Sequence, residues 1–137
     1  MSHHGSCLCG GIKFEMSKAP AAVVNCHCSI CRDSHGATFA TQGIFPAESF
    51  SVKEGEDKIT EYESSTDFFR VFCKSCGSHV VNYPRNRMFY SVAVNYLEEK
   101  IQPEMHIWVG SKAEWYNIND SLPQDEKMDK LMAKLQG

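Results

Sequence analysis

The 137-residue sequence lacks the features that define several common classes of protein. It has no uninterrupted apolar run near the roughly 20 residues that a membrane span requires, so we expect no membrane association. The N-terminus, MSHHGSCLCGG, has neither the basic nor the apolar stretch of a secretory signal. Low-complexity tracts and linkers are also missing, so we expect one domain over residues 1–137.

The sequence also has no excess of basic over acidic residues. The chain has 14 Lys and Arg against 17 Asp and Glu, with a formal net charge of −3. Because nucleic-acid-binding domains usually present a basic surface, we expect no nucleic-acid partner. A small molecule or a protein stays open as the partner, and we give no role to His3 and His4.

Cysteine is what the chain has in abundance. The seven cysteines form three groups, which are Cys7 and Cys9, then Cys26, Cys28 and Cys31, then Cys73 and Cys76. Such short spacings are hard to bridge as disulfides without strain, whereas they offer adjacent ligands to one tetrahedral ion. With no export signal in view, the pattern predicts a reduced, cytoplasmic metal protein.

The two outer pairs add up to one complete set of four ligands. Side chains alternate along an extended segment, so Cys7 and Cys9 point to the same side. Glycine follows the second cysteine of each pair and permits a tight turn in which two thiols converge. The spacing therefore predicts a closed structural zinc site made by Cys7, Cys9, Cys73 and Cys76.

The middle group, CHCSIC, leaves three thiols. They can bind a second zinc whose fourth position is open to water or substrate, as in catalytic sites. Two alternatives stay open on spacing. Cys28 and Cys31 could instead join the last pair in a zinc ribbon, or His27, His35 or a carboxylate could complete a second structural zinc.

Short alternating or β-branched segments predict a mainly β scaffold. These segments are residues 12–16, 22–25, 37–45, 58–65, 68–72, 79–83, 88–94 and 105–109. Turn signals between them favour antiparallel hairpins. Met128, Leu131, Met132 and Leu135 repeat at helical spacing, which predicts a C-terminal helix over about 124–136, after a core over about 5–123.

Four segments in fixed order carry a family resemblance. GSCLCGGIKFE, NCHCSICRDSHGATFA, FCKSCGSHV and SKAEWYNINDSLP resemble the family of glutathione-dependent formaldehyde-activating enzymes and centromere protein V. The resemblance implies zinc-bearing, twisted antiparallel β-sheets of the Mss-four-like type. It also implies two zinc ions, a structural one on the four outer cysteines and a catalytic one on Cys26, Cys28 and Cys31.

The activity implied by the resemblance is that of a carbon–sulfur lyase. Such an enzyme joins glutathione to formaldehyde as S-hydroxymethylglutathione and runs the reverse reaction, so glutathione and an aldehyde are the expected partners. A free thiol with a pKa of about 8.5 is only partly ionised at neutral pH. A zinc with an open position would bind the substrate sulfur as a thiolate.

Substrate contacts are expected near the three-cysteine group. Arg32 is a candidate to grip a glutathione carboxylate, and His35 is a candidate proton shuttle. Further cations, for which a surface position is the preferred interpretation, are Arg70, Lys74, Arg85 and Arg87. Aromatic candidates for the pocket or the core are Phe39 and Trp115.

The other histidines have plainer expected roles. His27 alternates with two cysteines and should point away from the ion, towards a supporting position or solvent. His79 is expected to be structural, and His106 to be an ordinary histidine of a strand.

Three other functions stay open. A zinc-binding adaptor resembling centromere protein V would use both ions structurally, although the chain lacks the long basic extension of such adaptors. A thiol redox sensor would release zinc and form a disulfide in the three-cysteine group. A methionine sulfoxide reductase needs a lone catalytic cysteine, and here every cysteine belongs to a group.

Overall fold

The computed structural model describes residues 2–136, and this part of the chain is mainly β, as predicted. Its strands are β1 His3–Ser6, β2 Lys13–Met16, β3 Ala22–Cys26, β4 Ala40–Pro46, β5 Phe50–Glu54, β6 Ile59–Ser65, β7 Phe68–Cys73, β8 His79–Pro84, β9 Phe89–Ala93 and β10 Met105–Ile107. Its α-helices are α1 Ser29–His35 and α2 Asp129–Gln136.

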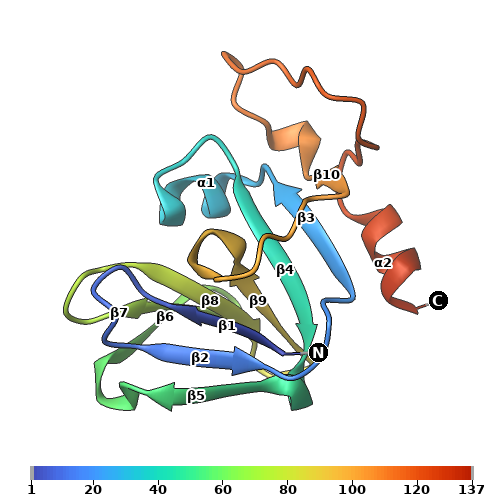
Figure 1. The fold of residues 1–137 in the computed structure, drawn as a ribbon. Coiled ribbons are helices and arrows are strands. Elements are labelled where there is room, and N and C mark those ends of the chain that lie inside the picture. Colours follow the sequence, from blue (N-terminus) through green and yellow to red (C-terminus); the bar gives the residue numbers. More distant parts are fainter. Residues whose placement is uncertain (1, 137) are drawn as a thin grey trace.

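The strands form two sheets (Figure 1). One has three strands in the order β1-β2-β5, and the other has seven in the order β10-β3-β4-β9-β8-β7-β6. The expectation of antiparallel pairing is wrong only for β10, which runs parallel to β3. The chain returns to β3 after six intervening strands, so no tight turn forces these two strands to run in opposite directions.

One face of the seven-stranded sheet packs against the three-stranded sheet. Val71, Val81 and Val92 from β7, β8 and β9 meet Phe14 and Phe45 there, and all five side chains are buried. Burial of one such side chain contributes roughly 1.5–3 kcal/mol. This core between the two sheets holds β7, β8 and β9 in place. The alternate residues of these strands point to the opposite face of the seven-stranded sheet.

The opposite face of the seven-stranded sheet has a second apolar core. Val24 and Ile44 of the sheet are buried there with Cys31 of α1 and Leu131 of α2. Figure 1 shows α2 beside β3, and α1 follows directly after that strand. The helices therefore sit on the face that also bears the three-cysteine group.

Three elements were absent from the sequence-based prediction: β1, β5 and α1. Helix α1 begins after Cys28, whose sulfur accepts a hydrogen bond from the Cys31 amide, and it ends at Gly36 in a left-handed conformation. A cysteine is an unusual N-cap, which hid this start; the C-terminal glycine was a usable signal. Because the chain leaves this helix only at Gly36, the predicted strand 37–45 begins at Ala40.

The C-terminal helix begins five residues later than predicted. The His106 amide donates to Pro123 O, and the Asp125 amide donates to His106 O, both at 2.9 Å. Residues 123–125 therefore run extended beside β10 rather than in a helix. The Asp125 carboxylate then accepts from the amides of Lys127 and Lys130 as the chain turns into α2.

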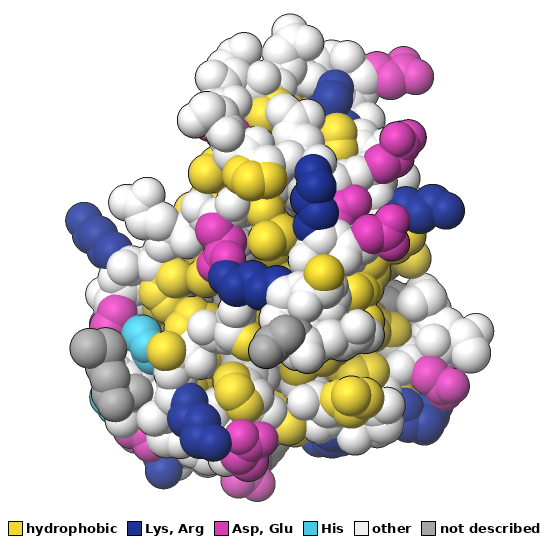
Figure 2. Space-filling view, turned by 90° about the vertical axis from the view of Figure 1, so that its right-hand side faces the viewer, with side chains coloured by type: hydrophobic (Ala, Val, Ile, Leu, Met, Phe, Trp, Pro, Cys, Tyr) yellow, Lys and Arg dark blue, Asp and Glu magenta, His cyan; other side chains and the backbone are white. Residues whose placement is uncertain are grey.

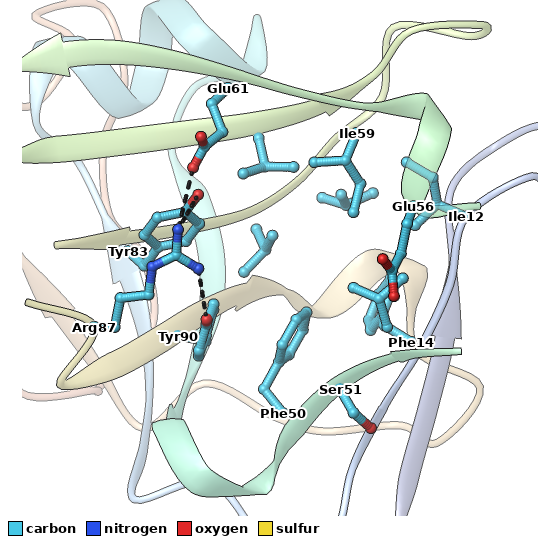
Figure 3. Close-up of a pocket in the computed structure, with 14 residues that line it drawn as sticks. Ile12, Phe14, Phe50, Ser51, Glu56, Ile59, Glu61, Tyr83, Arg87 and Tyr90 are labelled. Carbon is cyan, nitrogen blue, oxygen red and sulfur yellow. Dashed lines mark hydrogen bonds and ion pairs between the residues drawn. The ribbon is translucent and has the colours of Figure 1, made fainter. Parts of the chain in front are cut away.

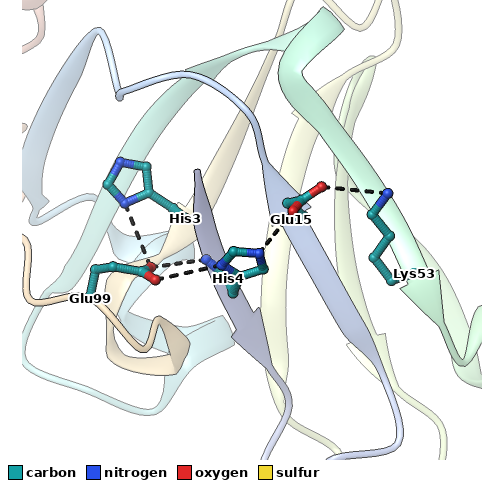
Figure 4. Close-up of polar contacts among 5 residues, drawn as sticks. All are labelled: His3, His4, Glu15, Lys53 and Glu99. Carbon is teal, nitrogen blue, oxygen red and sulfur yellow. Dashed lines mark hydrogen bonds and ion pairs between the residues drawn. The ribbon is translucent and has the colours of Figure 1, made fainter. Parts of the chain in front are cut away.

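Polar contacts hold the N-terminal strand in place (Figure 4). His4 Nε2 lies 2.8 Å from Glu15 Oε2 on β2, and Glu15 is 3.5 Å from Lys53 Nζ on β5. Glu99 accepts from the His4 amide at 2.9 Å and lies 3.6 Å from His3 Nδ1. The two histidines that were given no role thus anchor β1 within its sheet.

The surface around α2 carries charges of both signs. Figure 2 shows Lys and Arg side chains mixed with Asp and Glu, with apolar groups between them, on the face that bears α2. This face has no concentrated basic area of the kind that binds nucleic acid. None of the described helices is long and apolar enough to cross a membrane.

Candidate metal centres

The four outer cysteines meet at one point. Cys7 and Cys9 come from the turn between β1 and β2, Cys73 is the last residue of β7, and Cys76 lies in the turn that follows. Their sulfurs all lie within 4.8 Å of one another. Cys9 Sγ is 3.6 Å from Cys7 Sγ and 3.8 Å from Cys73 Sγ. Zinc–sulfur bonds of about 2.3 Å at tetrahedral angles separate sulfurs by about 3.8 Å. The cluster therefore fits a zinc ion.

The turns that carry this cluster point hydrogen-bond donors at the sulfurs. Cys7 Sγ accepts from the Ile12 amide at 3.3 Å, and Cys9 Sγ accepts from the Gly11 amide at 3.4 Å. The Ser78 hydroxyl beside its sulfur lowers the pKa of Cys76 to about 5. Donors of this kind favour the thiolate, which is the form that binds metal.

Glycine makes both turns possible. Gly10 and Gly77 each have a φ of +77°, a conformation that residues with a β-carbon rarely adopt. The amide of each glycine donates to the carbonyl of the first cysteine of its pair, at 2.9 Å for Gly10 and 2.7 Å for Gly77. The sequence-based explanation of these glycines is confirmed.

The three middle cysteines form a separate cluster. Cys26 ends β3, Cys28 caps α1 and Cys31 lies in the first turn of that helix, and their sulfurs are within 4.8 Å of one another. Hydrogen bonds from Cys26 and Cys31 hold the pKa of Cys28 far below its usual range, whereas the bond to Cys28 raises that of Cys26. Three converging thiols, one of them readily ionised, suit a metal ion.

The two clusters separate the cysteines into four and three, so a zinc ribbon that combines Cys28 and Cys31 with Cys73 and Cys76 does not match the geometry. No histidine or carboxylate among residues 2–136 joins either cluster as a further ligand. The metal-binding and catalytic roles of the cysteines stay predictions. What the structure adds is the surroundings of each cluster.

Arg70 is the residue that sequence reasoning misplaced. A surface position was expected, yet the side chain is 7% exposed and lies beside the three-cysteine cluster. Its Nη1 donates to Cys31 Sγ at 3.4 Å and its Nε to Ser64 Oγ at 3.1 Å. Its guanidinium also stacks over Phe68, 5.1 Å from the ring centroid. A fixed positive charge next to thiolates offsets part of their negative charge.

A cavity of about 570 Å³, which we call the triad cavity, opens beside Cys26, Cys28 and Cys31. All three line it, whereas none of the four outer cysteines does. Apolar side chains from segments far apart in the sequence form much of its wall, among them Ile30, Phe68, Phe89, Trp108 and Met128. Its polar lining includes the strand residues Gln42, Arg70, Asn82 and Ser91. Such a volume is in the range of small-molecule sites.

Arg32 does not line this cavity. Its Nε donates to His27 O at 3.3 Å and its Nη2 to Ser111 O at 3.0 Å, so the guanidinium ties α1 to the loop around Ser111. It borders a different, shallow hollow together with Trp115. Trp115 itself is 74% exposed and lies outside the triad cavity. Sequence proximity to Cys31 therefore did not bring Arg32 to the same cavity.

His35 is also set back from the cavity. Its ring stacks on that of His79 with centroids 3.8 Å apart, and its Nε2 lies 3.3 Å from Gln42 Nε2. Burial lowers the pKa of His35 to about 4 and that of His79 to about 3, so both are neutral at pH 7. Gln42 lines the cavity, so His35 reaches it only through that amide.

His27 points away from the cysteine cluster and is hydrogen-bonded into a series of polar side chains. Its Nε2 is hydrogen-bonded to His106 Nδ1 at 2.9 Å, and His106 Nε2 lies 3.0 Å from Asp120 Oδ2. Both imidazoles are fully buried, and Phe39 packs 4.9 Å from the His27 ring centroid. Phe39 therefore belongs to this packing rather than to the cavity, and His27 supports the turn between Cys26 and Cys28.

A second cavity, of about 490 Å³, lies between the two sheets (Figure 3). Arg87 closes one end, where it donates to Tyr90 Oη at 3.1 Å and approaches Glu61 Oε2 at 3.5 Å. Its side chain is exposed at the rim of this cavity. Lys74 and Arg85, which do not line the cavity, are exposed on the surface, as expected. No cysteine or histidine lines this cavity, so the reactive side chains belong to the first one.

Two β-sheets that carry a four-thiol and a three-thiol cluster define a cysteine-rich β protein with two candidate metal centres. Residues 2–111 match the family model of the glutathione-dependent formaldehyde-activating enzyme, and the chain belongs to that family. The family resemblance drawn from the sequence is confirmed.

Individual relatives are distant. A Talaromyces marneffei protein provisionally named a glutathione-dependent formaldehyde-activating enzyme is 32% identical over 76 residues, covering 54% of this chain and 41% of that protein. An uncharacterized lyase of Schizosaccharomyces pombe is 32% identical over 76 residues, covering 56% and 53%. The chain spans about half the length of these two relatives.

Two further proteins match over more of their length. A Halomonas elongata protein with the same provisional name as the Talaromyces protein is 25% identical over 131 residues, covering 88% of this chain and 83% of that protein. The crystal structure of a Rhodobacter sphaeroides protein superposes with a TM-score of 0.60 at 27% identity, covering 72% and 90% of the two chains.

Proposed function

We propose that this protein is a zinc-dependent carbon–sulfur lyase acting on glutathione and formaldehyde or a related aldehyde. The site is formed by Cys26, Cys28 and Cys31. The observation that carries the proposal is the cavity of about 570 Å³ that these three thiols line and the four outer cysteines do not. Family membership supports the class of reaction.

In the forward reaction, the sulfur of the thiol bonds to the carbonyl carbon. The π electrons of the carbonyl move to its oxygen, and the thiol proton ends on that oxygen, giving the S-hydroxymethyl product. A zinc held by the three cysteines would keep the incoming sulfur as a thiolate at neutral pH. Arg70, 3.4 Å from Cys31 Sγ, supplies a positive charge to this group of anions in a site shielded from water.

The apolar and the polar residues that line the cavity have different roles in this proposal. Phe68, Phe89 and Trp108 exclude water from the reacting sulfur, and the strand residues offer hydrogen-bond donors to the substrate. The proton-shuttle role of His35 stays a prediction, because Gln42 stands between its ring and the cavity.

A cytoplasmic location is part of the same proposal. All seven cysteines are free thiols in the structure, which suits a reducing compartment. Cell fractionation with an antibody against the protein tests this placement.

Metal content and activity measured on the same samples test the function. We expect two zinc ions per chain in the wild type and one in Cys28→Ser, with the fold retained and glutathione–formaldehyde exchange lost. Ser51→Ala, which changes a serine of the other cavity, should keep both ions and the activity. Two ions without exchange for any thiol would favour a zinc-binding adaptor and refute the lyase.

A further inference from the structure

Three polar side chains form a row across the floor of the triad cavity. The β7–β8 register places Arg70 opposite Asn82, and the β8–β9 register places Asn82 opposite Ser91. Neighbouring strands are about 4.8 Å apart, so the row spans about 10 Å. It begins beside the cysteine cluster, because Arg70 Nη1 is 3.4 Å from Cys31 Sγ. All three residues line the cavity.

This row is buried, and its donors are not fully used. Arg70 is 7% exposed, and Asn82 and Ser91 are each 2% exposed. Within residues 2–136, Asn82 Nδ2 and Ser91 Oγ have no hydrogen-bond partner. Over the same residues, the ion pairs of the structure do not include Arg70. Buried donors without acceptors are costly, so their presence on a cavity floor points to a ligand that supplies the acceptors.

The chemistry of the row selects the ligand. A guanidinium, a carboxamide N–H and a hydroxyl together offer several donors and one full positive charge. A carboxylate has two oxygens that accept several hydrogen bonds and a negative charge that matches Arg70. An aldehyde oxygen is a single neutral acceptor and would leave most of these donors unused.

We propose that Arg70, Asn82 and Ser91 form a subsite for a carboxylate of the thiol substrate. The proposal rests on the proposed function, because it takes the substrate sulfur to lie at the three-cysteine cluster. The row then selects thiols that carry a carboxylate within about 10 Å of the sulfur. Arg32 does not line the cavity, and its guanidinium is bound to the main-chain carbonyls of His27 and Ser111, so Arg70 replaces it in this role.

Binding of a matched pair of thiols tests the subsite. The probes are 3-mercaptopropionate and its methyl ester, which differ in the carboxylate charge. Trp108 lines the cavity, so its fluorescence reports binding to the zinc-loaded protein without any turnover. We expect the wild type to bind the acid at least tenfold more tightly than the ester. Asn82→Leu and Ser91→Ala should each reduce this preference about fivefold or more.

An added negative charge and a matched control extend the test. Asn82→Asp should make the acid bind more weakly than the ester, because two carboxylates would then be adjacent. Ser51→Ala, which changes a serine of the other cavity, should keep the wild-type preference. Far-ultraviolet circular dichroism establishes that each variant is folded, and Ser91→Ala stands as an independent test if a change at Asn82 prevents folding.

Three results would overturn the subsite. The first is equal binding of acid and ester by the wild type, and the second is an unchanged preference in the folded Asn82 and Ser91 variants. The third is a fall in kcat of these variants that is the same for both thiols at unchanged affinity, which would assign the donors to the aldehyde oxygen. Selective binding of the acid without glutathione–formaldehyde exchange would support the subsite and refute only the proposed function.

Discussion

The four-cysteine cluster should stabilise the fold far more than the three-cysteine cluster. It joins the β1–β2 turn of one sheet to the β7–β8 turn of the other, and the contacting residues Cys9 and Cys73 are 64 positions apart in the chain. Cross-linking a loop of this length lowers the entropy of the unfolded chain by an amount equivalent to about 4 kcal/mol. The other cluster links only the end of β3 to the first turn of α1.

Serine substitutions compare the two clusters directly. Cys9 is exposed, so Cys9→Ser removes a ligand with little loss of packing. We expect the free energy of unfolding of the zinc-loaded protein to fall by about 4 kcal/mol. In the matched variant Cys28→Ser, serine still caps α1, and we expect a fall of about 1 kcal/mol or less.

Urea unfolding followed by circular dichroism at a fixed free zinc concentration measures both changes. Zinc content is determined on the same samples to establish that each variant has lost one ion. An equal loss of stability in the two variants would refute the reasoning, because it would show that the three-cysteine cluster also holds distant parts of the fold together.

The remaining predictions concern pH and the arginines. Burial lowers the pKa of His35 to about 4, below the value of about 6.5 in the unfolded chain, so the unfolded state binds more protons between these pH values. Stability should be full above pH 6.5 and fall as the pH drops towards 4; by pH 5 the contribution lost is about 2 kcal/mol, and His35→Gln should lack that loss in urea unfolding at pH 7.5 and 5. In the exchange assay, Arg70→Gln should reduce kcat/KM for glutathione at least tenfold, because it removes a buried charge beside Cys31. Arg32→Gln should change it less than about threefold, and the reverse order would contradict the assignment of Arg70.

Strand prediction succeeded where side chains alternate over a half-buried sheet. Segments 68–72 and 79–83 match β7 and β8 to within one residue at each end. It failed for β1 and β5, which lie in the smaller sheet and are short, and for α1, which begins at a cysteine cap. That residues 1–137 form one domain stays a prediction.

The sequence by itself determined the family and the grouping of the cysteines, because ligand spacing and turn glycines are local properties of the chain. Only the tertiary structure decided the surroundings of the three-cysteine group. Arg70, Asn82 and Ser91 are 12 and 9 positions apart in the sequence, and strand register alone brings them into one row beside Cys31. Arg32 is adjacent to Cys31 in the chain, yet the helix directs its guanidinium elsewhere. Which cation faces the cavity therefore depends on side-chain direction in the folded sheet, which sequence proximity does not specify.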